Sequence, residues 1–272
     1  MIRTDCAAVR KFIGSAIDMD EKPERIAKVM ARAGLCSRRE AERWIAAGRI
    51  AVDGKTLESP AFTVTKINRI EVDGNPISPP DSTRVWRYHK PAGFMTTQHD
   101  PEGRPTVFES LPASLPRVIS IGRLDLNSEG LLLLTNDGAL ARKLELPSTG
   151  WTRRYRVRVH GRVQEHELGS MRKGITVAGI RYAPVEVEKE GQTGANAWLA
   201  MALKEGKNRE IRKMCENFGW RVNRLIRTSY GPFPLGKLPR GAVEEVPQRV
   251  VTEQTGVKFA KPKRHANYRR KA

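Results

Sequence analysis

Residues 118–138 read VISIGRLDLNSEGLLLLTNDG, and in this stretch two apolar runs enclose a short polar loop. The pattern predicts the end of a buried strand before the loop and a second buried strand, with four consecutive leucines, after it. The polar residues between them include Arg123, Asp125 and Glu129. Charged groups between two buried segments need partners or solvent, so we expect the loop to face a cleft. Taken alone, Asp125 predicts only a tightened turn.

The charge of the chain indicates its kind of partner. The 272 residues carry a formal net charge of +19, from 49 Lys and Arg against 30 Asp and Glu. Such an excess predicts a polyanionic partner, usually nucleic acid. We expect no membrane association, because the sequence holds no apolar run near the roughly 18 residues that a span needs and no long basic amphipathic helix.

The cysteines and the first residues indicate the compartment. Cys6, Cys36 and Cys215 lie far apart and show no C-x-x-C spacing, so neither a zinc site nor a disulfide framework is predicted. This pattern fits a reducing cytoplasm. Residues 1–23 do not read as a signal peptide, because charged residues interrupt their apolar run, and we expect them to be a disordered extension.

Residues 24–74 predict a small domain of two helices followed by strands. The second helix begins at an S-x-x-E capping box formed by Ser37 and Glu40. A spacing of about 100° per residue places Arg39 and Arg43 together on the side opposite its apolar stripe. Arginines so placed usually form a solvated face. An Asp-Gly hairpin turn follows, and a further strand-like region extends through residues 62–72.

The composition divides the rest of the chain into three parts. Residues 75–83, NPISPPDST, are rich in proline and turn-forming residues and predict a linker. Residues 84–250 mix strands with short helices and predict a second, larger domain. Residues 251–272 have no acidic residue after Glu253 and predict a basic tail that adds nonspecific RNA affinity.

Two residues of the larger domain lie on apolar faces of predicted elements. In residues 151–161, WTRRYRVRVHG, the alternation places Tyr155 with two valines on one face of a strand. A tyrosine there is usually a core residue. A helix beginning near Asn208 places Arg212 at the edge of its apolar stripe, within reach of a cleft. An arginine there usually forms a surface ion pair.

The stretch SRREAERWIAAGRIAVDGK, residues 37–55, resembles the S4 RNA-binding domain. The resemblance covers residues 24–74 and implies that the second helix and the hairpin contact RNA phosphates. The implied patch consists of Arg38, Arg39, Arg43, Arg49 and Lys55.

The stretch GRLDLNSEGLLLLTNDG, residues 122–138, resembles the signature of the RsuA-type family of ribosomal RNA pseudouridine synthases, which join an S4 domain to a catalytic domain. Four further segments support the resemblance: HKPAGFMTT (89–97), RRYRVRVHG (153–161), EGKNREIRKM (205–214) and RLIRTSYGPFPLGKLPRG (224–241). It extends over about residues 24 to 247, and the last two segments are most similar to the large-subunit RluB branch.

The resemblance implies both a fold and a set of site residues. The implied fold is α+β, with a small N-terminal S4 domain and a catalytic domain built on a largely antiparallel mixed sheet with a central cleft. Asp125 is implied as the catalytic aspartate, Tyr155 as the residue that stacks on the nucleoside, and Arg212 as the basic partner of the aspartate. Leu225 is implied as the apolar residue below the base, and Arg123 as an RNA contact that helps to hold the flipped nucleotide.

The implied reaction is consistent with these residue types. It breaks a glycosidic C–N bond of uridine and joins the same two fragments by a C–C bond, so no cofactor and no metal are expected. A carboxylate can attack covalently or remove a proton, and a nearby arginine favours its ionised form. An aromatic face can hold the uracil once it leaves the RNA stack. The expected partner is ribosomal RNA, and the expected form is a monomer.

Three other functions stay open at the level of sequence. One is a synthase that acts on small-subunit ribosomal RNA. Another is a noncatalytic S4 protein of ribosome assembly, whose function would survive mutation of Asp125. The third is an N-glycosidase that uses Asp125 and Glu129 as a carboxylate pair and would release free uracil.

Overall fold

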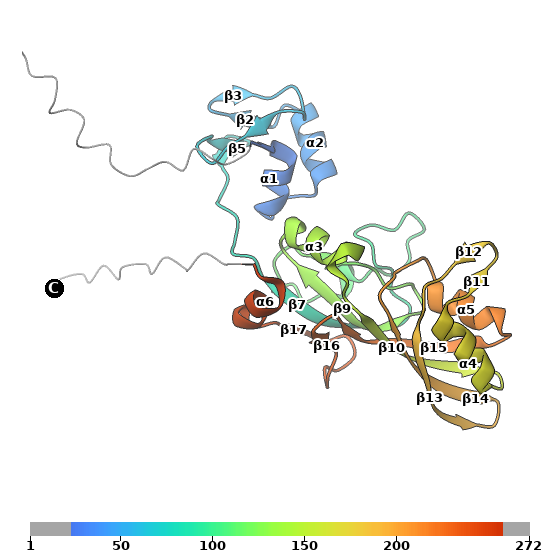
Figure 1. Cartoon of the computed structure of the whole chain (residues 1–272). Coiled ribbons are helices and arrows are strands. Elements are labelled where there is room, and N and C mark those ends of the chain that lie inside the picture. The colour runs from blue at the N-terminus through green and yellow to red at the C-terminus, as the bar shows by residue number, and fades with distance from the viewer. Residues whose placement is uncertain (1–22, 258–272) are drawn as a thin grey trace, which may run out of the picture. The chain divides into compact units, whose positions relative to one another are not determined.

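The computed structural model describes residues 23–257, which form two compact units that meet in the chain between Pro80 and Asp81 (Figure 1). This division lies within residues 75–83, where the sequence predicts a linker. The predicted extension up to residue 22 and the predicted tail from residue 258 lie outside the described residues.

The first unit is built from two short helices and small antiparallel sheets. One sheet has the strand order β3-β2-β5-β6, and β1 pairs with β4. Residues of both helices and of three of these strands share one core that includes Ile26, Met30, Ile45 and Ile50. The elements are β1 (Glu24–Arg25), α1 (Ile26–Arg32), α2 (Arg38–Ala46), β2 (Ile50–Val52), β3 (Lys55–Thr56), β4 (Thr63–Val64), β5 (Ile70–Val72) and β6 (Asn75–Pro76).

Local sequence signals explain how α2 begins. The Ser37 hydroxyl accepts a hydrogen bond from the backbone N–H of Glu40 at 3.0 Å, which caps the helix. The Glu40 carboxylate does not complete a capping box, because it accepts hydrogen bonds from Arg43 and Trp44 instead, each at 3.1 Å. The predicted helix start is therefore confirmed, with only the serine half of the predicted box in place.

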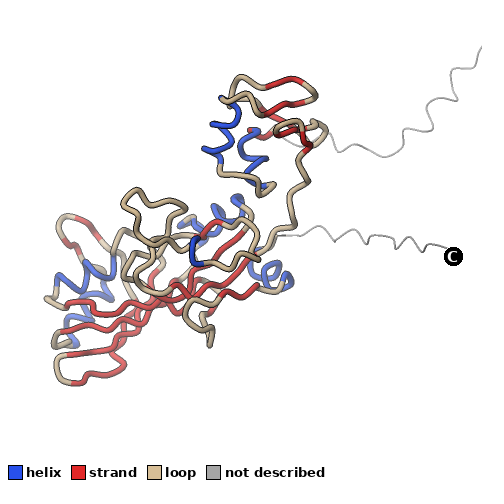
Figure 2. Tube along the Cα trace, turned by 180° about the vertical axis from the view of Figure 1, so that it is seen from behind, coloured by secondary structure: helices blue, strands red, loops and turns tan. Residues whose placement is uncertain are grey.

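The second unit contains a mixed sheet with nine strands among the described residues (Figures 1 and 2). Its main strand order is β13-β14-β10-β15-β9-β7-β17, while β16 pairs with β15 and β8 with β9. The strands are β7 (Val85–Lys90), β8 (Ile119–Ile121), β9 (Glu129–Thr135), β10 (Arg153–His160), β13 (Glu186–Thr193), β14 (Asn196–Leu203), β15 (Arg221–Tyr230), β16 (Phe233–Pro234) and β17 (Val243–Glu245). The remaining elements are η2 (Phe108–Ser110), α3 (Gly138–Glu145), η3 (Pro147–Thr149), α4 (Glu165–Lys173), β11 (Thr176–Val177), β12 (Ile180–Arg181), α5 (Glu210–Asn217) and α6 (Gln248–Thr255).

The four-leucine run forms the buried centre of this sheet. All seven residues of β9 are buried. Leu131 and Leu133 pack with α3 and α6 in one core, whereas Leu132 and Leu134 pack in another core with Trp86 of β7. Because successive side chains of a strand point to opposite faces, an uninterrupted apolar run is what a strand covered on both faces requires.

The strands β9 and β15 form the one parallel pair of this sheet in the described part of the chain, and the other pairs are antiparallel. Ile226 lies beside Glu129, and Arg227 beside Gly130. A β-carbon on Gly130 would lie 2.3 Å from the carbonyl oxygen of Arg227, and the φ of Gly130 is +103°. Only glycine fits this approach of two backbones. The predicted largely antiparallel mixed sheet is confirmed.

Helices complete the cores of the second unit. Residues of α4 and α5 pack with β10, β13, β14 and β15 in one core, and residues of α3 and α6 pack in another. Val251 of α6 is buried there, so this helix continues past residue 250, where the sequence predicts the domain to end. None of the helices within residues 23–257 is long and apolar enough to span a membrane.

Candidate active site

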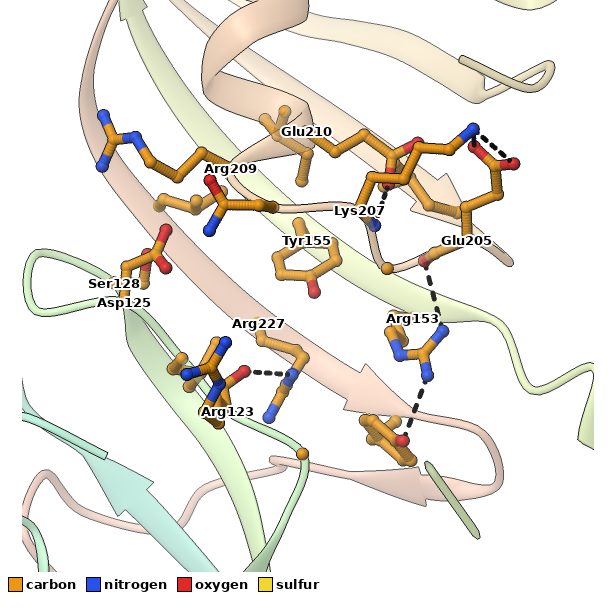
Figure 3. Close-up of a pocket in the computed structure, with 18 of the residues that line it drawn as sticks. Arg123, Asp125, Ser128, Arg153, Tyr155, Glu205, Lys207, Arg209, Glu210 and Arg227 are labelled. Atoms are coloured by element: carbon orange, nitrogen blue, oxygen red, sulfur yellow. Dashed lines mark hydrogen bonds and ion pairs between the residues drawn. The ribbon is translucent and has the colours of Figure 1, made fainter. Parts of the chain in front are cut away.

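A pocket of about 550 Å³ opens in the second unit where the loop between β8 and β9 faces β10, β15 and the start of α5 (Figure 3). The structure places every predicted site residue of this unit in its lining. These residues are Arg123, Asp125, Tyr155, Arg212 and Leu225. They come from the β8–β9 loop, β10, α5 and β15, so the fold brings together residues that are far apart in the sequence.

The loop that carries Asp125 is fixed through its backbone. Each carbonyl oxygen from residue 123 to residue 128 accepts a hydrogen bond. The donors at residues 123, 124 and 127 are Arg227 at 3.4 Å, Thr96 at 2.7 Å and Arg212 at 2.8 Å. A loop bound at every carbonyl holds its side chains in defined positions, which is the preorganisation that a catalytic group needs.

Lys90 binds the other carbonyls of this loop, and the sequence analysis missed it. Its side chain is fully buried, and its Nζ donates to the carbonyl oxygens of residues 91, 125, 126 and 128 at 2.8 to 3.3 Å. Burial lowers the pKa of Lys90 to about 8. The strand pattern could have indicated this burial, because alternation places Lys90 on the same strand face as the buried residues Trp86 and Tyr88.

The Asp125 carboxylate is available for chemistry. It is half-buried, and among the described residues it makes no hydrogen bond and no ion pair. The other three carboxylates of the lining, those of Glu145, Glu205 and Glu210, each accept a hydrogen bond from a backbone N–H. Asp125 is therefore the one pocket carboxylate in the described structure whose oxygens are unengaged.

Arg212 lies beside this loop and is largely buried, with 8% of its surface exposed. Its guanidinium donates to the carbonyl oxygens of residues 127 and 222, at 2.8 and 3.3 Å, and within the described residues its buried Nε has no partner. Burial lowers the pKa of Arg212, the charge of Arg209 lowers this pKa further, and the charge of Asp125 opposes both. The structure thus connects Arg212 to Asp125 through the loop backbone and through charge, while no ion pair between the two side chains is among the described contacts. Its assignment as the partner of Asp125 stays a prediction.

Tyr155 and Leu225 present an aromatic and an aliphatic surface on neighbouring strands. Tyr155 of β10 pairs with Arg227 of β15, and Val157 pairs with Leu225. Tyr155 and Leu225 are therefore diagonal neighbours on one face of the sheet. In Figure 3 the Tyr155 ring lies in the middle of the pocket, between the Asp125 loop and the start of α5. The predicted strand and the predicted face of Tyr155 are confirmed.

A carboxyl pair lies at the opposite edge of the pocket. Glu210, the first residue of α5, is 5% exposed, and its carboxylate also accepts a hydrogen bond from the backbone N–H of Lys207 at 3.2 Å. Burial, with the nearby charge of Glu205, raises the pKa of Glu210 to about 7. Glu205 in turn binds the Lys207 ammonium at 3.0 Å.

Glu129 is already neutralised. It is 5% exposed, and its carboxylate pairs with Arg224 at 2.5 Å and with Arg240 at 2.8 Å. It is also absent from the residues that line the pocket. A carboxylate that is held by two arginines and does not line the pocket is poorly placed to work with Asp125 as an acid–base pair.

The five predicted RNA-binding residues of the first unit are all exposed, namely Arg38, Arg39, Arg43, Arg49 and Lys55. Two of them already have partners. Arg43 pairs with Glu40 at 3.1 Å, and Arg49 binds both carboxylate oxygens of Asp73 and lies 4.7 Å from the centre of the Trp44 ring. A role of these residues in RNA binding stays a prediction.

The pocket therefore offers an unengaged carboxylate, an aromatic face and several guanidinium groups. A carboxylate can act as a nucleophile or as a base. An aromatic face suits a planar ring, and guanidinium groups suit phosphates. Within residues 23–257 no group of three or more His, Cys, Asp or Glu side chains is arranged to hold a metal ion.

Comparisons with known proteins agree on one kind of enzyme. Residues 84–217 match the family model of RNA pseudouridylate synthase, and residues 24–70 match the S4 domain. An uncharacterised RNA pseudouridine synthase of Rickettsia felis is 49% identical over 228 residues, which are 84% of this chain and 99% of that protein. The ribosomal large subunit pseudouridine synthase B of Salmonella typhi is 45% identical over 230 residues, which are 82% of this chain and 79% of that protein.

The fold has a counterpart among solved structures. A crystal structure of a pseudouridylate synthase aligns with a TM-score of 0.60 over 85% of this chain and 98% of that chain. Its sequence identity of 22% makes this a likeness of fold.

Proposed function

The chain belongs to the RNA pseudouridine synthase family, a family of isomerases, and carries an S4 domain, and we propose that it converts a uridine of large-subunit ribosomal RNA to pseudouridine at Asp125. The relative from Salmonella typhi is named for the large ribosomal subunit, and this supports the choice of RNA. The reaction breaks the C1′–N1 bond and forms a C1′–C5 bond. A proton leaves C5 and one is gained at N1, so atoms and electrons balance.

The unengaged carboxylate of Asp125 carries the proposal. No donor among the described residues binds its oxygens. The backbone on both sides of Asp125 is held by hydrogen bonds from Lys90, Thr96, Arg212 and Arg227. A fixed backbone with a free carboxylate is suited to attack on carbon or to removal of a proton. A structural aspartate in such a loop would be expected to bind its own backbone.

The surrounding residues are assigned from their positions. Tyr155 stacks on the extruded nucleoside, and Leu225 supports it from the neighbouring strand. Arg212 binds the backbone of the loop that carries Asp125 and places a positive charge near it, and its buried Nε has no partner among the described residues. Arg123, exposed at the pocket, contacts the RNA strand from which the nucleotide is turned out.

The alternative functions have weaker support. An N-glycosidase built on Asp125 and Glu129 would need a second available carboxylate, whereas Glu129 is paired with two arginines. A noncatalytic binder would gain nothing from a half-buried carboxylate in an immobilised loop.

The test is the substitution Asp125→Asn. It preserves the size of the side chain and removes its charge, and an amide is neither an effective nucleophile nor an effective base at neutral pH. We expect pseudouridine formation in a ribosomal RNA transcript to fall below detection, at least 10³-fold on the scale of a lost catalytic group, while affinity for the transcript changes little. Thermal unfolding of both proteins serves as the folding control. Turnover of Asp125→Asn near the parent rate would refute the assignment.

We propose further that the enzyme works as a monomer in the cytoplasm. This chain supplies a residue for each role assigned at the site, so no assigned role requires a residue from a second copy. Light scattering coupled to size-exclusion chromatography should give the mass of one chain. A dimer at micromolar concentration would contradict this proposal.

A further inference from the structure

The geometry points to Arg209 as a phosphate-binding residue that, together with Arg123, holds the RNA backbone on two sides of Asp125. This inference rests on the proposed function, because it takes the ligand to be an RNA strand. It assigns to the start of α5 a contact with the phosphate next to the reacting uridine.

Most cations of the pocket are already bound to protein atoms. Arg153, Arg212 and Arg227 donate to backbone carbonyl oxygens, and Lys207 pairs with Glu205. The two others in the lining are Arg123 and Arg209. Both are exposed, and among the described residues their side chains make no hydrogen bond, ion pair or ring contact.

The two arginines lie on different segments, since Arg123 belongs to the loop that carries Asp125 and Arg209 immediately precedes α5. In Figure 3, Arg209 lies above Asp125 and Arg123 below it, and the Tyr155 ring lies between their levels. A nucleotide whose base stacks on Tyr155 has one phosphate on its 5′ side and one on its 3′ side. The two free guanidinium groups could each bind one of these phosphates, since a guanidinium group binds phosphate with two parallel hydrogen bonds.

The backbone of Arg209 is strained, and its neighbours hold it in place. It has φ 51° and ψ 31°, in the left-handed region that few residues other than glycine adopt. The Arg209 carbonyl oxygen accepts a hydrogen bond from the N–H of Lys213 at 2.9 Å, and Glu210 binds the N–H of Lys207. A conformation of this kind is energetically costly for a residue with a β-carbon, and such residues cluster at ligand-binding sites.

The charges at this edge of the pocket also favour an anion. Arg209 lies close enough to Arg212 for its charge to lower the pKa of Arg212. Like charges held near each other disfavour each other's charged form, while the charges of Asp125 and Glu216 favour the charged form of Arg212. A phosphodiester placed at Arg209 would relieve this repulsion, as a carboxylate does in an ion pair.

The experiment compares three variants of the full-length protein. Arg209→Asn removes the charge and tolerates the left-handed conformation, whereas Arg209→Lys keeps the charge. Arg249→Gln removes one positive charge from α6, where the Arg249 side chain is 88% exposed and outside the pocket lining. The dissociation constant of each protein for an unmodified large-subunit ribosomal RNA transcript is measured as a function of salt concentration.

Arg209→Asn should flatten the logarithmic salt dependence by about 0.7, the value for one lost contact to a single strand. Arg209→Lys and Arg249→Gln should keep the parent slope. A parent-like slope for Arg209→Asn, or an equal loss in Arg209→Lys, would overturn the inference. A parent protein that binds the transcript but forms no pseudouridine would refute the proposed function and leave the phosphate contact standing.

A second measurement locates the contact. RNA oligonucleotides carry one uncharged methylphosphonate immediately 5′ or 3′ of the uridine that the parent protein modifies. In the parent, each of the two substitutions should raise KM, and in Arg209→Asn one of them should have no further effect. Effects of both substitutions that stay independent of, and additive with, Arg209→Asn would place Arg209 away from both phosphates and refute the inference.

Discussion

Lys90 binds the catalytic loop from inside the protein, and its substitution tests how far Asp125 depends on the loop backbone. Lys90→Met has a similar length and removes the donor that four carbonyl oxygens share. A buried polar group left unsatisfied costs roughly 1–3 kcal/mol, so we expect a clearly lower melting temperature together with slower pseudouridine formation. Lys173→Met, at the exposed end of α4, is the control. A melting temperature equal to that of the control variant would show that the backbone hydrogen bonds hold the loop without Lys90.

The sequence predicted the residues that line the pocket better than the residues that hold the pocket in shape. The alternation of one strand predicted the face of Tyr155 and the stripe of one helix predicted the position of Arg212, because both signals are local, while their place at the site was implied by the family resemblance. The burial of Lys90 depends on a carbonyl cluster formed by a loop more than thirty residues later in the chain, which no local pattern contains. The two arginine partners of Glu129 come from segments that are still more distant, and so the sequence alone left Glu129 open as a second catalytic carboxylate.

Glu210, at the start of α5, should make the free energy of unfolding depend on pH. The pKa of Glu210 is raised from 4.5 to about 7 in the folded protein, so the folded state binds more protons than the unfolded state between these values. The contribution of this group is therefore fully present below about pH 4.5 and is lost as pH rises through about 7.

Glu210→Gln imitates the protonated carboxyl group and should remove this dependence. We expect its free energy of unfolding in urea to match that of the parent near pH 5 and to exceed it near pH 8, with a difference on the order of 1 kcal/mol. A variant that differs from the parent equally at both pH values would show that Glu210 does not titrate in this window.

In the first unit, the exposed face of α2 should supply RNA affinity. Replacing Arg39 and Arg43 by alanine should flatten the salt dependence of ribosomal RNA binding by about 0.9 for each lost contact to a duplex phosphate. Arg49→Ala is the comparison, because the Arg49 guanidinium is already bound by Asp73 and should contribute less to the slope. Filter binding across a salt series measures all three proteins. An unchanged slope in the double variant would remove these arginines from the RNA footprint.

Elements with local signals were predictable, and those that depend on distant pairing were not. The capped start of α2 and the Asp-Gly hairpin appear where the sequence predicts them. The strand-like region expected through residues 62–72 is wrong as a single strand, since β4 and β5 are separated by a turn in which Ile67 is 79% exposed. Apolar residues alone do not show where a strand breaks, because a turn depends on backbone and side-chain hydrogen bonds such as that from the N–H of Thr65 to Asn68.

For the whole molecule, the decisive observation is which RNA loses a modification. In a strain without this gene, pseudouridine mapping should show one site missing from large-subunit ribosomal RNA, and the parent gene should restore it. The gene for Asp125→Asn should not restore it. A missing site in small-subunit ribosomal RNA would overturn the choice of substrate while leaving the chemistry intact. The charge of +19 predicted a nucleic-acid partner from composition alone, whereas the choice of the large subunit came from the family resemblance and is supported by the relative from Salmonella typhi.

The parallel pairing of β9 with β15 has a consequence for the order in which the protein is made. It joins residues 129–130 to residues 226–227, and closing so long a loop is entropically costly and slow. A ribosome delivers the chain from its N-terminus, so Asp125 leaves the exit tunnel long before Arg212, Leu225 and Arg227. A nascent chain therefore has a complete S4 core well before it has a pocket. Translation that stops early therefore releases a product that has the S4 domain and lacks the pocket.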